Sequence, residues 1–199
     1  LLVSGYFGNP ASSFGHALLK FNTADGETNL LDLSFNFGAL VPENEWVLRY
    51  IVRGLSGGYE SGFSDRHFYT QDLVYARTEF RDMWDYELAL TDDQRTLLVL
   101  HLWEVIGKKF TYYFLTKNCA YRLAELMELA TGRSFTARAS VWYVPVELFH
   151  RLEALDAERP GTLIRSQRFI PSSQRVLYHQ FDRLRDDEAR LANALIATA

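Results

Sequence analysis

The sequence predicts a single α+β domain in which an antiparallel sheet packs on helices. Two observations favour this class. Near the N-terminus, two runs rich in Leu and Phe flank Asp25-Gly26, a dipeptide that favours a hairpin turn between strands. From residue 91 onward, helical patterns with capping residues and terminal glycines follow one another. A length of 199 residues is typical of one domain, and 48% hydrophobic residues are enough to build its core.

Composition and charge exclude several classes of function. The formal net charge is -4, and no cluster of Lys and Arg supplies the basic surface that nucleic-acid binding needs. No apolar run approaches the roughly 18 residues that cross a bilayer. Cys119 is the single cysteine, which excludes an intramolecular disulfide and a cysteine-based zinc cluster. Motifs of glycosidases, zinc hydrolases, serine hydrolases and nucleotide-binding proteins are missing from the sequence, so we expect no metal and no cofactor.

The hairpin pattern predicts strands near residues 16–21 and 30–37. In the second strand, apolar residues at 31, 33, 35 and 37 alternate with Asp32, Ser34 and Asn36. This alternation predicts one apolar face and one polar face that is available for chemistry.

Residues 54–65 contain four glycines among Ser and Tyr, which predicts a long surface loop. We expect this loop to be mobile and to overhang the catalytic groove, because glycines cost ordering entropy and loops often cover sites. Further strands are predicted at 74–80 and 82–90.

Helix signals dominate the second half of the chain. A capping box at Thr91 opens a helix that ends near Gly107, and Asn118 precedes a second helix that stops at Gly132. A third helix is predicted from Pro145 to Leu155, and a long fourth one after Ser172-Ser173. Residues 156–199 are a candidate C-terminal helical extension.

Cys119 lies at a helix N-terminus in this interpretation. The positive end of the helix dipole and its free N–H groups favour a thiolate and could hold an oxyanion, which is the position of a nucleophile. The alternative is that the residue is a small, buried and inert hydrophobe.

A cysteine nucleophile needs a base, and His16 is the best of the five histidines. It lies at the start of a predicted strand and shares a hairpin with the polar face of the next strand. The other four lie in helical segments or at the edge of the glycine-rich stretch, where structural roles are common: His67, His101, His150 and His179.

The length of the hairpin loop selects the partner of His16. A three-residue loop places His16 opposite Ser34 or Asn36, whereas a two-residue loop places it opposite Phe35. We favour the first register and expect Asn36 to orient the imidazole, with Ser34 and Asp32 as the alternatives.

Three motifs at residues 9–16 (NPASSFGH), 79–86 (EFRDMWDY) and 112–119 (YYFLTKNC) resemble the Lnb N-terminal periplasmic domain family of bacterial envelope proteins. The resemblance runs from about residue 4 to about residue 150. It implies a circularly permuted papain-like fold over the whole chain, with Cys119 as nucleophile and His16 as base. It also implies a periplasmic, membrane-associated protein.

Several other residues are expected to support substrate binding or the site. These are Ser12, Ser34, Asn118 and Tyr113. Within the second motif, Arg81 and Asp82 are interpreted as a structural ion pair beneath Trp84.

The resemblance implies an acyltransferase that works at the membrane surface. A phospholipid would donate an acyl chain to Cys119, and the α-amino group of a lipoprotein N-terminal cysteine would accept it. Alternatives are a cysteine amidase or peptidase acting on cell-wall peptide, a phospholipid hydrolase with the same two residues, and a binding module without activity. The oligomeric state stays open.

Overall fold

The computed structural model describes residues 1–5, 15–22, 30–42, 44–136 and 142–197. Over these residues the protein is an α+β fold with a seven-stranded antiparallel sheet in the order β6-β4-β3-β2-β1-β5-β7. The strands are β1 (Leu2–Ser4), β2 (His16–Phe21), β3 (Leu33–Ala39), β4 (Tyr59–His67), β5 (Met83–Leu88), β6 (Phe110–Tyr112) and β7 (Ile164–Ile170).

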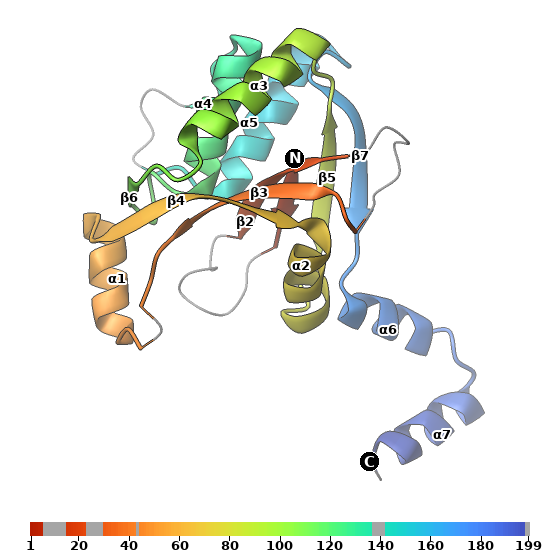
Figure 1. Ribbon diagram of the computed structural model, residues 1–199. Coiled ribbons are helices and arrows are strands. Elements are labelled where there is room, and N and C mark those ends of the chain that lie inside the picture. Colours follow the sequence, from red (N-terminus) through yellow and green to blue (C-terminus); the bar gives the residue numbers. More distant parts are fainter. Residues whose placement is uncertain (6–14, 23–29, 43, 137–141, 198–199) are drawn as a thin grey trace.

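Seven α-helices and one π-helix accompany the sheet in the described ranges. They are α1 (Val47–Ser56), α2 (Phe68–Asp72), the π-helix η1 (Leu73–Thr78), α3 (Asp92–Val105), α4 (Cys119–Thr131), α5 (Pro145–Glu158), α6 (Ser173–Phe181) and α7 (Asp186–Ile196). In Figure 1, α3, α4 and α5 lie on one side of the sheet, and α1 and α2 lie on the other.

Hydrophobic side chains are buried on both faces of the sheet. The larger core lies beneath α3, α4 and α5 and includes Phe37, Leu98, Leu123, Met127 and Leu148. A smaller cluster on the opposite face joins the sheet to α2 and η1 through Leu2, Leu18, Phe68, Ala76 and Met83. The sheet is therefore a central layer whose two faces are both covered.

This layering corrects the expected polar face of the second strand. Ser34 is buried and its hydroxyl donates to the Arg66 carbonyl at 2.7 Å, and buried Asp32 pairs with Lys20 at 3.4 Å. Leu31, assigned to the apolar face, is exposed and precedes β3. The reason is tertiary: the smaller cluster covers the face that the alternation leaves to solvent.

The β2–β3 pairing is confirmed, but its connection is longer than expected. Phe21 pairs with Leu33, and Leu18 pairs with Asn36. His16 therefore has its side chain on the same face as Ser34 and Asn36, as the preferred register predicts, but the predicted three-residue loop is wrong. His16 therefore has neither Ser34 nor Asn36 as its direct partner. The Asp25-Gly26 turn itself lies outside the described residues.

Strands β2 and β3 separate at one end of their ladder. Their pairing ends at Leu18 and Asn36, whereas β1 stays paired with β2 as far as His16, and β3 with β4 as far as Ala39. The sheet thus contains a fork between the start of β2 and the end of β3.

The glycine-rich stretch is not a long surface loop, so the predicted loop is wrong. Its residues form the end of α1 and strand β4. A Cβ on Gly54 would lie 2.2 Å from the Phe114 ring, and Gly57 ends the helix with φ +80° against Tyr113. These glycines permit close packing and a left-handed helix end.

The predicted strand at 74–80 is also wrong. These residues lie mostly in η1, where Ala76 packs into the smaller cluster, so tertiary packing outweighs the β-propensity of the segment. The strand predicted at 82–90 is confirmed as β5.

The helices of the second half are largely confirmed. Thr91 and Gln94 form both bonds of a capping box at α3, Asn118 caps α4, and Gly132 ends it with φ 68°. Helix α5 starts at Pro145 and extends to Glu158.

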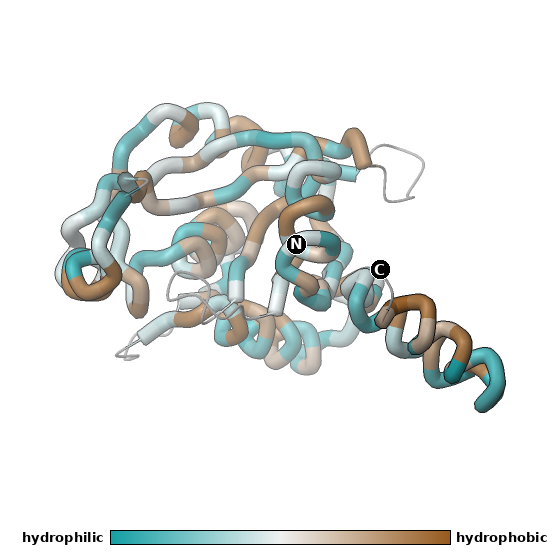
Figure 2. Tube along the Cα trace, turned by 90° about the horizontal axis from the view of Figure 1, so that it is seen from below, coloured by the Kyte–Doolittle hydropathy of each residue, from teal (hydrophilic) through white to brown (hydrophobic). Residues whose placement is uncertain are grey.

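The predicted long fourth helix is two helices. α6 ends at Phe181, and α7 begins after Arg185, whose backbone N–H donates to the Glu188 carboxylate at 2.9 Å. The capping box at Arg185 begins a new helix, so the chain does not continue as one long helix. The preceding β7 pairs with β5, so residues 156–199 are not purely helical. No residue of α6 or α7 is buried, and Figures 1 and 2 show the pair extending from the body of the protein.

Candidate active site

Cys119 is the first residue of α4, and its position is fixed by the Asn118 cap. The Asn118 side-chain oxygen accepts from the N–H groups of Ala120 and Tyr121 at 3.1 and 3.2 Å. Its amide nitrogen donates to the carbonyls of Phe114 and Tyr143. Because all of these bonds are internal, Asn118 supports the site by holding the helix start.

The Cys119 thiol lies at the fork in the sheet. Cys119 is only 2% exposed, and its sulfur accepts hydrogen bonds from the backbone N–H groups of Ala17 and Ala120. Ala17 lies in β2 beyond the last residue paired with β3, so its N–H is turned to the sulfur instead of a strand partner. The separation of β2 from β3 is thus what brings strand and helix N-terminus together.

His16 lies between Cys119 and Asn36. Its ring is hydrogen-bonded to the Cys119 thiol, and its Nε2 is hydrogen-bonded to the Asn36 side-chain oxygen. Since that oxygen is an acceptor, Nε2 carries the proton and Nδ1 is left for the sulfur. The structure therefore brings Cys119, His16 and Asn36 together, the three residues expected to carry chemistry.

The electrostatics of the pair favour a thiolate and an imidazolium. Burial disfavours charge on His16, yet the neighbouring Cys119 sulfur and the Asn36 bond raise the His16 pKa above its ordinary 6.5. Burial likewise opposes the thiolate, but His16 and the two backbone N–H groups lower the Cys119 pKa below its ordinary 9.0. Each partner thus stabilises the charged form of the other.

Two tyrosines near the sulfur were not anticipated from sequence. The Tyr112 hydroxyl accepts the backbone N–H of Cys119, and the Tyr75 ring lies 5.9 Å from the His16 ring. Burial raises the pKa of both phenols, which keeps them protonated. Tyr112 begins the third motif, so its place in a short strand leading to the cysteine helix was a usable signal. No sequence signal pointed to Tyr75, because its segment was predicted to be a strand.

The other expected support residues do not meet at the thiol. Ser34 bonds to Arg66 on a different part of the sheet, and the Tyr113 ring packs over Gly57. Ser12 lies outside the described residues.

The expected ion pair between Arg81 and Asp82 is wrong. Arg81 is buried and pairs with Glu79 at 2.5 Å, whereas Asp82 pairs with Arg175 at 2.6 Å. Adjacent residues on an extended chain point in opposite directions, so each found a different partner. The Trp84 ring packs against the Phe169 ring at a tilt of 54°, with ring centroids 5.2 Å apart.

A mostly apolar cavity of about 420 Å³ adjoins the strand that carries His16. Its walls come from β1, β5 and the start of α5, and include Val3, Trp84, Val144, Val146 and Phe149. Two lining residues are the strand partners of the site: Ser4 pairs with His16, and Val3 pairs with Ala17. His150 and Glu153 also line this cavity.

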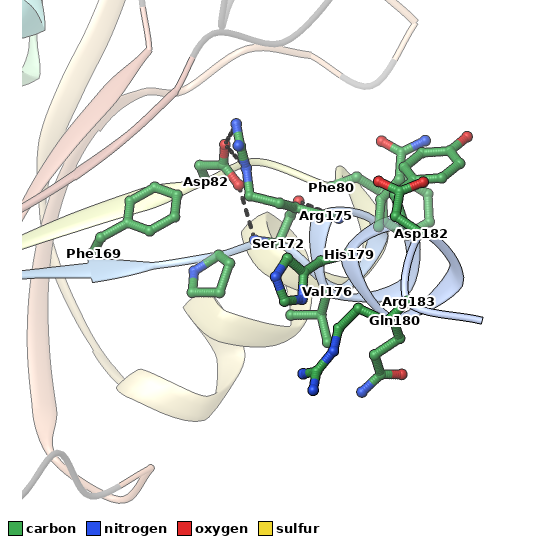
Figure 3. A pocket seen from close by; sticks show the side chains of 13 residues that line it. Phe80, Asp82, Phe169, Ser172, Arg175, Val176, His179, Gln180, Asp182 and Arg183 are labelled. Carbon is green, nitrogen blue, oxygen red and sulfur yellow. Dashed lines mark hydrogen bonds and ion pairs between the residues drawn. The ribbon is translucent and has the colours of Figure 1, made fainter. Parts of the chain in front are cut away.

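A larger, open cavity of about 760 Å³ lies along α6 (Figure 3). Asp82 and Arg175, which line it, are paired with each other. Cys119, His16 and Asn36 line neither this cavity nor the 420 Å³ cavity, and they meet where β2 and β3 separate. We therefore place the candidate site at the fork. Among the residues that the structure describes, no group of three or more His, Cys, Asp or Glu could hold a metal ion.

The fold and the site define an α+β domain in which a cysteine at a helix N-terminus meets a histidine and an asparagine from neighbouring antiparallel strands. A family model described as the Lnb N-terminal periplasmic domain matches residues 1–154, and the chain belongs to that family. Searches of curated proteins and of solved structures found no match. The family assignment supports a periplasmic location. In the described part of the chain, every helix is too short or too polar to cross a membrane.

Proposed function

We propose that this domain is a cysteine-dependent acyltransferase that takes an acyl chain from a phospholipid and transfers it to the α-amino group of a lipoprotein N-terminal cysteine. The observation that carries the proposal is the Cys119–His16–Asn36 arrangement, and an apolar cavity lined by the strand partners of His16 and Ala17 supports it. We also infer a circularly permuted papain-like fold, because the histidine strand precedes the cysteine helix in the chain.

In the first half-reaction, the Cys119 thiolate attacks the carbonyl carbon of the donor ester. The bond between sulfur and carbon forms, the ester C–O bond breaks, and the His16 imidazolium gives its proton to the departing alkoxide. A thioester acyl-enzyme and a neutral His16 result.

In the second half-reaction, the acceptor amine attacks the thioester. His16 takes the amine proton, the C–S bond breaks, and the thiolate and imidazolium are restored. The products are an amide and the starting enzyme, so proton and charge balance over the cycle.

Tyr112 is the candidate donor to the oxyanion. Its oxygen already accepts the Cys119 N–H, so its own O–H is left to donate to a tetrahedral intermediate next to the sulfur. The raised pKa of Tyr112 keeps that proton in place at neutral pH.

The cavity favours an acyl chain over a peptide. Its walls are mainly hydrocarbon, and burial of a fatty chain against such walls gains about 0.8 kcal/mol per methylene. A peptide substrate would instead favour an arginine in this cavity for its carboxylate, and none is among the described residues that line it.

Intact-mass analysis after incubation with phospholipid vesicles tests the proposal. We expect the mass of the wild-type protein to increase by one acyl chain. Addition of a lipopeptide whose N-terminal cysteine has a free α-amino group should remove this adduct, and the lipopeptide should gain the chain. Cys119→Ser and His16→Ala should give no adduct. Release of free fatty acid without acceptor acylation would identify a phospholipid hydrolase, and cleavage of cell-wall peptide without any lipid adduct would identify an amidase; either result overturns acyl transfer.

A further inference from the structure

Helix α1 exposes large apolar side chains along its outer surface. The residues concerned are Trp46, Val47, Leu48, Val52 and Leu55. Trp46, at the N-cap, is 68% exposed, and Leu48 is 58% exposed. A ten-residue helix that leaves this much apolar surface in water is unusual for a protein that acts alone.

The inner surface of α1 is attached to the candidate site. Tyr50 packs on Phe114 with ring centroids 4.8 Å apart, and Gly54 lies against the same ring. The Phe114 carbonyl accepts from Asn118, the residue that caps the cysteine helix. Helix α1 therefore packs against the segment that leads into the cysteine helix, with its apolar side turned outward.

A second set of exposed apolar residues lies on the η1 side of the site. Leu31, Tyr69 and Leu73 are exposed, and the Tyr69 N–H donates to the Leu30 carbonyl at 2.7 Å. Tyr75 of η1 contacts the His16 ring. In Figure 1, α1 and α2 project from the same side of the sheet, and Figure 2 views the molecule from that side.

The charges near these helices are complementary to phosphate. The charged residues of α1 are Arg49 and Arg53, and the neighbouring Glu45 carboxylate is buried between them at 3.3 and 2.8 Å. A groove of about 330 Å³ that includes Asn36 is lined by Arg66, Lys108 and Lys109, and Lys109 is paired with Glu60 at 2.6 Å. Five cations, three of them paired with Glu45 or Glu60, therefore line α1 and this groove.

We propose that the exposed side of α1, together with Leu31, Tyr69 and Leu73, is a docking face for the phosphate-bearing surface of a lipid bilayer. Apolar side chains enter the acyl boundary, Trp46 lies at the headgroup level, and the arginines meet phosphate, as in interfacial amphipathic helices. The inference rests on the proposed function for the identity of the lipid as acyl donor. Binding itself is measurable without turnover.

Vesicle flotation and tryptophan quenching test the docking face in the intact protein. We expect binding to vesicles of phosphatidylethanolamine and phosphatidylglycerol, weaker binding to phosphatidylcholine alone, and loss of most of the anionic preference in Arg49→Gln. Brominated acyl chains should quench Trp46 strongly. Replacement of Trp46 by Phe should remove most of this quenching. Trp103, which is 73% exposed on α3 on the other side of the sheet, should be quenched little by the brominated chains.

A matched pair of leucine variants separates a specific face from general hydrophobicity. Leu48→Asp should weaken vesicle binding at least tenfold, while Leu100→Asp, at a leucine 60% exposed on α3, should leave it unchanged. Equal effects of the two variants, or quenching of Trp103 in place of Trp46, would overturn the proposal. So would a Leu48-dependent dimer in sedimentation velocity without vesicle binding, which would assign the face to a second copy of the chain.

The two proposals fail in different ways. Vesicle binding that depends on Leu48, without any thioester on Cys119, supports the docking face and contradicts the acyltransferase. A thioester that forms equally well in Leu48→Asp, with unchanged vesicle binding, contradicts the docking face alone.

Discussion

His16 and Asn36 are hydrogen-bonded across the point where β2 and β3 separate. Asn36 is paired with Leu18, two residues further along β2, so its amide side chain reaches back diagonally to Nε2 of the His16 ring. This bond fixes the ring orientation and leaves Nδ1 for the Cys119 sulfur. The unpaired end of the two strands is therefore closed by side chains that serve the site.

Asn36→Ala should lower the rate of acyl transfer by roughly 10–1000-fold and leave measurable activity, equivalent to about 1.4–4 kcal/mol of transition-state stabilisation. The Asn36 bond raises the His16 pKa, so its loss should also move the alkaline limb of the pH profile to lower pH. The pH dependence of kcat/KM measures both effects. Ser34→Ala is the matched control, because that hydroxyl bonds to the Arg66 carbonyl and should not move the limb. An unchanged profile in Asn36→Ala would contradict the orienting role.

Cys119→Ser and His16→Ala should each abolish turnover while preserving the fold, since both residues act in bond-making and proton transfer. Thermal unfolding and circular dichroism should stay close to wild type, and the thioester adduct should be absent. Retention of more than a few per cent of the wild-type rate in either variant would refute the assignment of the pair.

The Cys119 thiol should react with iodoacetamide at neutral pH, because its pKa lies below the ordinary 9.0 while His16 stays protonated above its ordinary 6.5. As pH falls, the rate should decline only when the thiolate takes up its proton. Without the imidazolium, burial dominates and the Cys119 pKa rises, so His16→Ala should slow alkylation at pH 7 by roughly tenfold or more. The rate of alkylation against pH, followed by intact mass, measures this. Equal rates in the two proteins would show that the thiolate does not depend on His16.

Gly54→Ala should destabilise the protein by about 1–3 kcal/mol, because the new Cβ would lie 2.2 Å from the Phe114 ring. Gly38→Ala is the control, since a Cβ there would meet nothing within 4 Å, and its effect should be within about 0.5 kcal/mol. Urea unfolding of the two variants compares them. Similar stabilities would mean that α1 shifts freely away from Phe114, which would contradict the close packing of Gly54 on that ring.

The helices were predictable because their signals are local. Thr91 with Gln94, Asn118, Gly132 and Pro145 each act within a few residues of the helix end that they define. The same locality placed Cys119 at a helix start and His16 at a strand start. Both residues could therefore be named from sequence, before any contact between them was known.

What only the tertiary structure decided is how distant segments meet. The hairpin pattern identified Asn36 although the predicted loop length was wrong, because a register shift of two residues keeps each side chain on the same face of the strand. The diagonal bond from Asn36 to His16 could not be predicted from that pattern. Tyr75, Tyr112 and the apolar cavity come from segments brought together by the fork and by α5. The glycines of α1 and β4 look like a flexible loop in sequence, because nothing nearby shows the Phe114 and Tyr113 rings that require them. Local propensity specifies where elements start and stop, whereas packing between elements specifies which side chains surround the thiol.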